Sequence, residues 1–174
     1  MKRRNQTVTM IVTAAMIAAL YVVLSFLINT FSLASGAIQF RVSEALTILP
    51  AFTSAAVPGV TIGCFLFNLL SGAPLPDIIF GTIATFLGAI GSRLIAKQLR
   101  GKKWMPYILP LPPIFANACI IPWVLKTAYG VTDVYWYLFA TVGIGEVLSC
   151  GVLGIILYIS LRPFAHILFH NTNF

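Results

Sequence analysis

The sequence predicts an all-α integral membrane protein, a bundle of six transmembrane helices that forms one domain over residues 1–174. Composition is the first reason, because 59% of the residues are hydrophobic, only 9% are charged and the mean hydropathy is +0.96. A soluble domain of this length has too little interior to bury so much apolar surface. The spacing of charge is the second reason. Uncharged runs of 36 and 32 residues, Asn5–Phe40 and Ala45–Pro76, are long enough to cross a bilayer.

The first three spans follow from these two uncharged runs. Residues 8–28 form the first span, because a helix rises ~1.5 Å per residue and the hydrocarbon core is ~30 Å thick. The second run would make a helix of ~48 Å, which is too long for one span. Pro58-Gly59 lies close to its middle and is expected to break it into two short helices, residues 42–55 and 57–70.

The remaining spans are predicted at residues 76–98, 105–126 and 134–161. The turn-rich stretch SGAPLPD leads into the first of these. Pro76 suits the first position of a helix, and the helix dipole favours the negative charge of Asp77 in the first turn.

Positive charge predicts how the bundle sits in the cell membrane. Two basic clusters flank apolar runs, at residues 2–4 and 93–103. Counting residues 42–70 as a hairpin of two helices places both clusters on the same side, whereas a single span would separate them. Basic loops face the cytoplasm, so both termini are predicted to be cytoplasmic. The net charge of +7 then indicates orientation in the bilayer and not nucleic-acid binding.

The segment QFRVSEALTILP, residues 39–50, concentrates the unusual chemistry of the chain. It places Gln39, Arg41, Ser43 and Glu44 within six residues, between two long apolar stretches. A cation and an anion in this position mark either a membrane surface or the mouth of a site inside the membrane. Glu44 also has a structural interpretation, as an acid in the first turn of a helix that pairs with Arg41.

Glu146 is the most informative single residue, because it falls near the middle of the last predicted span. A carboxylate at that depth is expensive and faces a cavity, a partner or a ligand. Ligand binding is slightly favoured over a buried structural carboxyl group. The other candidate ligand-binding residues are polar or aromatic side chains that also have structural interpretations, as helix links, a helix-start acid or an interfacial belt: Asn68, Asp77, Asn117 and Trp123.

Motifs of known enzyme classes are absent from the sequence: it has no Walker sequence, no HExxH and no nucleophile elbow. Cys64, Cys119 and Cys150 lie in apolar segments without CxxC spacing, so no disulfide framework, metal site or cofactor is indicated. An acidic and aromatic pocket near the outer face suits a small polar ligand that is flat or cationic. The chain is therefore predicted to bind a small molecule and not to be an enzyme.

The first span carries a patch of small residues, Ala14, Ala15, Ala18 and Ala19. Small residues four apart let another helix backbone approach closely. The patch is either internal packing or a docking face for another subunit, and the spacing alone favours internal packing.

Six spans, some of them short, in a small basic protein with this alanine pattern resemble the substrate-binding S components of energy-coupling factor (ECF) transporters. Two longer strings, QFRVSEALTILPAFTSAAVPG and GAPLPDIIFGTIATFLGAIGSRL, resemble the queuosine-precursor transporter (QueT) family. The likeness covers most of the chain and is densest from Gln39 to Leu94.

This resemblance implies a six-helix bundle of the ECF S-component type, which captures its solute from outside and does not hydrolyse ATP itself. The implied partners are a transmembrane coupling protein and two cytoplasmic ATPases. The four alanines match the motif that contacts the coupling protein, which reverses the preference for internal packing. The implied ligand is a deazaguanine base, such as the aminomethyl precursor of queuosine, whose N–H donors suit a carboxylate such as Glu146 or Glu44. The alternatives are an S component for another vitamin, or an intramembrane enzyme or scaffold.

Overall fold

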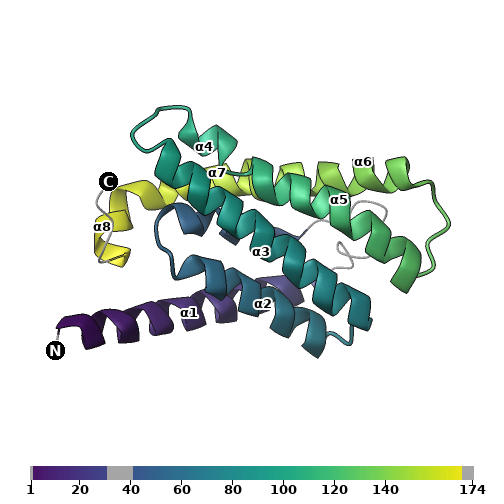
Figure 1. Cartoon of the computed structure of the whole chain (residues 1–174), viewed down its shortest axis with the longest axis horizontal. Helices are drawn as coiled ribbons and strands as arrows, with labels where there is room; N and C mark the ends of the chain where they lie inside the picture. Colours follow the sequence, from purple (N-terminus) through teal and green to yellow (C-terminus); the bar gives the residue numbers. More distant parts are fainter. Residues whose placement is uncertain (1, 31–40, 170–174) are drawn as a thin grey trace.

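The computed structural model describes residues 2–30 and 41–169, and every regular element in these ranges is a helix (Figure 1). The elements follow one another in this order: α1 (Lys2–Thr30), the 3₁₀ helix η1 (Val42–Ala51), α2 (Ala56–Leu70), α3 (Leu75–Gln98), α4 (Met105–Ile108), α5 (Leu111–Ala128), α6 (Tyr135–Glu146), the π-helix η2 (Val147–Leu153), α7 (Gly154–Leu161), the 3₁₀ helix η3 (Arg162–Phe164) and α8 (Ala165–Leu168).

Four helical stretches among the described residues are long and apolar enough to cross a membrane: Gln6–Asn29, Leu75–Gln98, Met105–Ala128 and Tyr135–Phe164. η1 and α2 are also apolar but have only 10 and 15 residues. At about 2.0 and 1.5 Å per residue, neither reaches across a hydrocarbon core of ~30 Å. The chain is a multi-pass bundle of membrane helices, and the count of six spans stays a prediction.

The break in the second uncharged run falls at Phe52–Ala55, just before Pro58-Gly59 and close to the predicted place. Pro58 and Gly59 do not interrupt a helix; they lie in the first turn of α2. Proline is tolerated there because the first N–H groups of a helix have no acceptor within the helix. The element before the break also differs from the expected α-helix, since η1 is a 3₁₀ helix that ends at Ala51 and contains Pro50.

Two glycines bring α2 close to α1. A Cβ atom on Gly59 would lie 3.0 Å from the carbonyl oxygen of Ala14, and one on Gly63 would lie 3.1 Å from that of Ala18. Any larger residue would push the two backbones apart, so glycine is what allows this approach. Ala14 and Ala18 therefore face α2, and Ala18 is buried.

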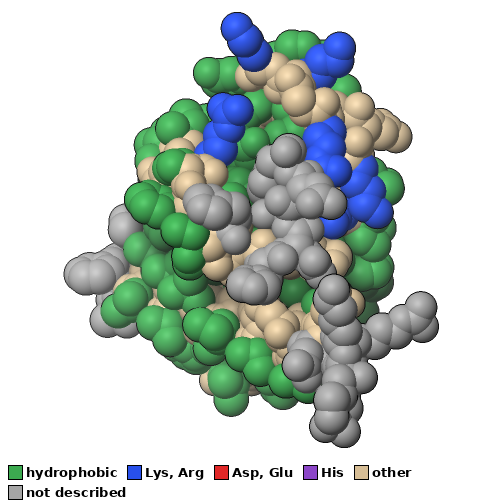
Figure 2. All heavy atoms as spheres, turned by 90° about the vertical axis from the view of Figure 1, so that its left-hand side faces the viewer, with side chains coloured by type: hydrophobic (Ala, Val, Ile, Leu, Met, Phe, Trp, Pro, Cys, Tyr) green, Lys and Arg blue, Asp and Glu red, His purple; other side chains and the backbone are tan. Residues whose placement is uncertain are grey.

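The long helices run roughly along one axis of the molecule, so that their connections gather at its two ends (Figure 1). The start of α1, the connection from α3 to α4 and α8 lie at one end, and the α2–α3 and α5–α6 connections lie at the other. Figure 2 looks at the first end and shows lysine and arginine side chains gathered on it, with no acidic side chain among the described residues in view. We call it the basic end.

The apolar core lies near the basic end and surrounds the last turn of η1. Phe52 stacks on Tyr158 of α7 with ring centroids 4.8 Å apart. Arg93 of α3 donates from Nη1 to the carbonyl oxygen of Pro50 at 2.8 Å. This bond satisfies a carbonyl group at the end of a buried helix, where no further turn supplies a donor. The packing fixes η1 inside the bundle, with residues 43–51 all buried.

Candidate functional site

Two irregular helices meet inside the bundle and position the candidate site. η1 is a ten-residue 3₁₀ helix, η2 is a seven-residue π-helix, and the two pack against each other. 3₁₀ runs of this length are uncommon, and π segments are frequent at functional sites. η1 carries Glu44 in its first turn, while η2 begins directly after Glu146 and carries Cys150.

Glu44 is almost completely buried, at 1% exposure, and its two carboxyl oxygens have different surroundings. Oε1 accepts a hydrogen bond from the Tyr21 hydroxyl of α1 and another, at 3.2 Å, from Oγ1 of Thr85 in α3. Oε2 is buried without a hydrogen-bond partner among the described residues. A buried acceptor without a donor costs about 1–3 kcal/mol. A ligand that donates to Oε2 recovers this cost.

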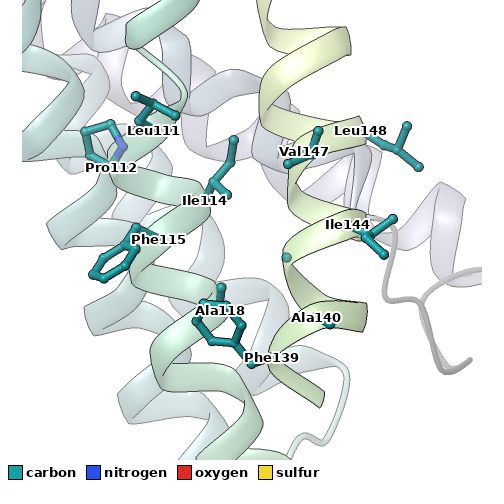
Figure 3. A pocket seen from close by; sticks show the side chains of 11 residues that line it. Leu111, Pro112, Ile114, Phe115, Ala118, Phe139, Ala140, Ile144, Val147 and Leu148 are labelled. Carbon is teal, nitrogen blue, oxygen red and sulfur yellow. The ribbon is translucent and has the colours of Figure 1, made fainter. Parts of the chain in front are cut away.

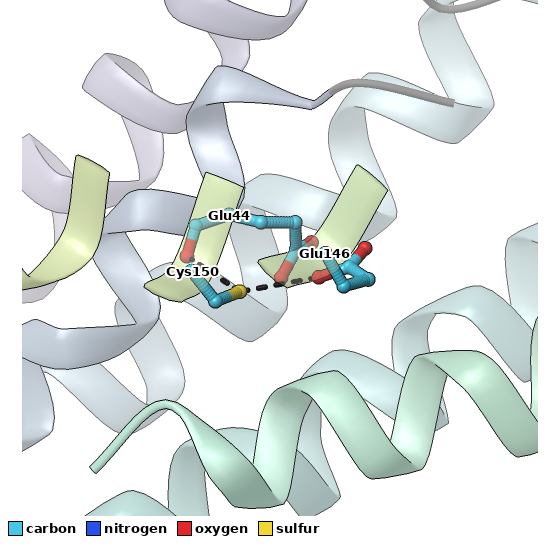
Figure 4. Close-up of side chains that lie close together, drawn as sticks. All are labelled: Glu44, Glu146 and Cys150. Atoms are coloured by element: carbon cyan, nitrogen blue, oxygen red, sulfur yellow. Dashed lines mark hydrogen bonds between the residues drawn. The ribbon is translucent and has the colours of Figure 1, made fainter. Parts of the chain in front are cut away.

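Glu146 lies beside Glu44, although 102 positions separate them in the sequence. Its Oε2 accepts a hydrogen bond from Sγ of Cys150 at 3.1 Å. One carboxyl oxygen of Glu44, one of Glu146 and the Sγ atom of Cys150 all lie within 4.8 Å of one another (Figure 4). Atoms of this kind at this spacing can surround the N–H donors of a ligand or a small cation. We call these residues the carboxylate cluster: Tyr21, Glu44, Thr85, Glu146 and Cys150.

A second polar group, the Asp77 cluster, lies at the end opposite the basic end and consists of Asn68, Asp77 and Tyr129. Oδ2 of Asp77 accepts a hydrogen bond from the Tyr129 hydroxyl at 2.6 Å. Nδ2 of Asn68 donates to the Asp77 carbonyl oxygen at 3.3 Å. Oδ1 of Asp77 is buried without a partner among the described residues. Gly81 provides the space, since a Cβ atom there would lie 3.0 Å from Oδ1.

Arg41 connects the two clusters electrostatically. Burial acts to lower the pKa of its guanidinium group, but nearby groups, Asp77 first among them, hold that pKa above its ordinary value. Arg41 therefore remains a cation. Burial, followed by the hydrogen bond to Asp77, raises the pKa of Tyr129, so its phenol stays protonated and keeps donating.

The structure brings four of the eight predicted binding residues into these two clusters: Glu44, Asn68, Asp77 and Glu146. Asn117 is buried, donates to the carbonyl oxygen of Pro113 at 3.1 Å and also interacts with Glu146. Trp123 lies away from both clusters. It is 46% exposed on the outside of the bundle, and its ring packs edge-on against Phe80. Gln39 lies outside the described residues. The ligand-binding role of every one of these residues stays a prediction.

Four members of the clusters were not among the predicted binding residues: Tyr21, Thr85, Tyr129 and Cys150. Cys150 stands four residues after Glu146, so helical spacing could have placed the two side chains together. Thr85 stands eight residues after Asp77, about two turns along the same face of α3. Tyr21 gives no comparable signal, because a tyrosine in an apolar helix usually belongs to the packing or the membrane interface.

A groove elsewhere on the molecule is apolar, unlike the two polar clusters. It lies between α5 and the α6–η2 helix and has a volume of about 740 Å³ (Figure 3). Its lining is apolar throughout: Leu111, Pro112, Ile114, Phe115, Ala118, Phe139, Ala140, Gly143, Ile144, Val147 and Leu148. Such a lining suits the hydrocarbon of a lipid, whereas a polar base would lose hydrogen bonds to water there.

Comparisons with known proteins place the chain among membrane transporters. The family model described as QueT transporter matches residues 11–163, a range that contains every member of both clusters. The protein named Queuosine precursor transporter QueT of Lactococcus lactis subsp. cremoris (strain MG1363) is 42% identical over 77 residues. That match covers 44% of this chain and 45% of the relative, less than half of each. No solved structure matches. Because the family model covers most of its length, the chain belongs to the QueT transporter family.

Proposed function

We propose that this protein is the substrate-binding S component of an ECF transporter. It captures a queuosine precursor, a deazaguanine base or a related salvage form, for uptake by a separate ATP-driven module. One observation carries the proposal: within a bundle of this family, Glu44 and Glu146 are buried side by side, and one oxygen of Glu44 lacks a donor among the described residues. The relative's name, which specifies a queuosine precursor, supports the choice of ligand.

The ligand chemistry fits the carboxylate cluster. A guanine-like edge presents adjacent N–H donors, and a carboxylate accepts two such donors in parallel. Glu44 and Glu146 supply the carboxylates, and Asn117 beside Glu146 supplies an amide that can donate to a ring nitrogen or carbonyl oxygen. The Asp77 cluster and Arg41 form the polar entrance. Trp123 packs against Phe80 on the surface, so we give it no role in ligand binding.

The orientation in the membrane is part of the proposal. The basic end is cytoplasmic, and the end with the Asp77 cluster faces outside, because positive residues concentrate on the cytoplasmic side of membrane proteins. A cysteine in place of Lys102 should be labelled by a membrane-impermeant thiol reagent only after the cells are opened, whereas one in place of Thr132 should be labelled in intact cells. Labelling of Lys102→Cys in intact cells would show the opposite orientation.

Docking on the coupling protein is assigned to the exposed half of the alanine patch. Ala15 and Ala19 are exposed on α1, whereas Ala14 and Ala18 face α2. Two small residues four apart leave a smooth strip on the membrane-facing side of α1, on which a partner helix can pack closely. The fourfold alanine motif thus divides into an internal half and an external half.

Energised uptake tests this function. Cells that contain the protein, the coupling protein and both ATPases should accumulate a labelled deazaguanine base in unchanged form. Cells with catalytically inactive ATPases should bind the base but not accumulate it. Conversion of the base by the isolated protein would favour an intramembrane enzyme, and accumulation of a different vitamin would favour an S component of other specificity.

A further inference from the structure

We propose that the carboxylate cluster exchanges a proton for a cation: Glu44 and Glu146 share one proton in the ligand-free protein, and a protonated amino group on the bound base replaces it. The inference rests on the proposed function and narrows the substrate class. The preferred ligand is then a deazaguanine base that carries a primary amine, and a base of the same shape with a neutral substituent binds more weakly.

The geometry of the two carboxyl groups carries the inference. Glu44 and Glu146 are 1% and 4% exposed, and one oxygen of each lies within 4.8 Å of the other (Figure 4). Two negative charges this close in a water-poor interior repel strongly, so that one of the pair keeps a proton. The surroundings of Oε2 of Glu44 independently indicate a missing donor, because this oxygen is buried with no hydrogen-bond partner among the described residues.

The side chains around Glu44 and Glu146 do not take the place of the proton that the two acids share in the ligand-free protein. Tyr21 and Cys150 donate hydrogen bonds to the pair as neutral groups. Arg41 is one cation that interacts with three acidic side chains, Glu44, Glu146 and Asp77. The elements packed around the pair contribute the following groups: Tyr21 from α1, Cys64 from α2, Thr85 from α3, Asn117 from α5, Cys150 from η2, and Arg41 before η1, which also interacts with Asp77 of α3.

Exchange keeps the charge of the buried site constant. Before binding, two carboxylates that share one proton carry a net charge of minus one. Afterwards, two carboxylates and one ammonium group carry the same charge, and the displaced proton leaves to the surrounding water. No covalent bond forms. An ammonium group has three N–H donors, which is enough to bond to both carboxylates, the unpartnered oxygen of Glu44 included. Because binding releases a proton, affinity rises with pH as long as the free pair keeps its shared proton and the amine, which deprotonates at about pH 10, keeps its own.

Calorimetry on the purified full-length protein, with a metal chelator present, tests the exchange. The probes are a deazaguanine base with an aminomethyl group and the same base with a methyl group, each titrated in two buffers of different ionisation enthalpy. The aminomethyl base should release about one proton, and its affinity should rise by up to about tenfold per pH unit. The methyl base should bind more weakly and release none.

A matched pair of variants locates the proton. Glu146→Gln should bind the aminomethyl base without proton release, whereas Asp133→Asn, a change to an exposed acid in the α5–α6 loop, should behave like the wild type. Equal, pH-independent binding of both bases to the wild type would overturn the exchange and leave the proposed function intact. Failure of both bases to bind would overturn the proposed function as well. The comparison of the two bases needs no variant, so it stands even if Glu146→Gln does not fold.

Discussion

Replacing Glu44 by Gln should weaken binding of a deazaguanine base by about tenfold to a hundredfold, since a hydrogen bond to a charged group contributes about 1.5–3 kcal/mol. The amide oxygen of the substituted side chain can still accept from Tyr21 and Thr85, which both bond to one oxygen of Glu44. The amide nitrogen then occupies the position of the unpartnered oxygen and presents N–H groups to the donors of the ligand. Titration calorimetry with the base measures the loss.

Melting of the ligand-free protein separates binding from structure. The Glu44→Gln variant should melt close to the wild type, because it keeps the volume of the side chain and removes a buried charge. Asp133→Asn is again the control, with unchanged affinity and unchanged melting. Unchanged affinity of Glu44→Gln together with a large loss of stability would make Glu44 a structural residue. The ligand would then have to be bound by the Asp77 cluster and Asn117.

Replacing Ala19 by Trp should abolish uptake while ligand binding to the isolated protein stays intact. Ala19 is exposed on α1, and an indole there would hold a partner helix away from the smooth strip that it forms with Ala15. Leu87→Trp is the matched control, because Leu87 is 49% exposed on α3 and lies outside this strip. Uptake assays in cells and calorimetry on the purified variants give the two readings.

The half of the alanine patch that faces α2, Ala14 and Ala18, should respond differently to the same substitution. Ala18 faces Gly63 of α2 at close range, so Ala18→Trp should lower stability, binding and uptake together. If Ala19→Trp also lowered binding and uptake in parallel, the exposed alanines would belong to the internal packing, and the docking assignment would be refuted. Full uptake by Ala19→Trp would refute it too.

The sequence predicted the bounds of two helices to within a residue, whereas the one expected at residues 105–126 is observed as two, α4 and α5. The helix expected at residues 76–98 is observed as Leu75–Gln98, and the one expected at residues 57–70 as Ala56–Leu70. The helix types of η1 and η2 were not foreseen. A 3₁₀ or π geometry depends on how a segment packs in the bundle, and the hydrophobic pattern of seven to ten residues does not distinguish it from an α-helix.

The candidate site was predicted in part. Glu44 and Glu146 stood out because acids inside apolar spans are expensive. Their closeness to each other is a tertiary contact across 102 positions, which a single sequence does not reveal. The prediction for Trp123 was ambiguous, because an aromatic residue at the outer end of a span fits a ligand platform and a packing contact equally well. The fold places Trp123 against Phe80.

Mass spectrometry of the small molecules that copurify with the protein would identify its ligand without any assumption about its chemistry. The protein should be purified from cells supplied with a mixture of vitamins and queuosine precursors, and its bound ligand released by denaturation and quantified. The wild type should carry an unmodified deazaguanine base at about one molecule per chain, and Glu44→Gln should carry much less of it. A stoichiometric amount of an unrelated vitamin, or a chemically altered base, would contradict the proposed function.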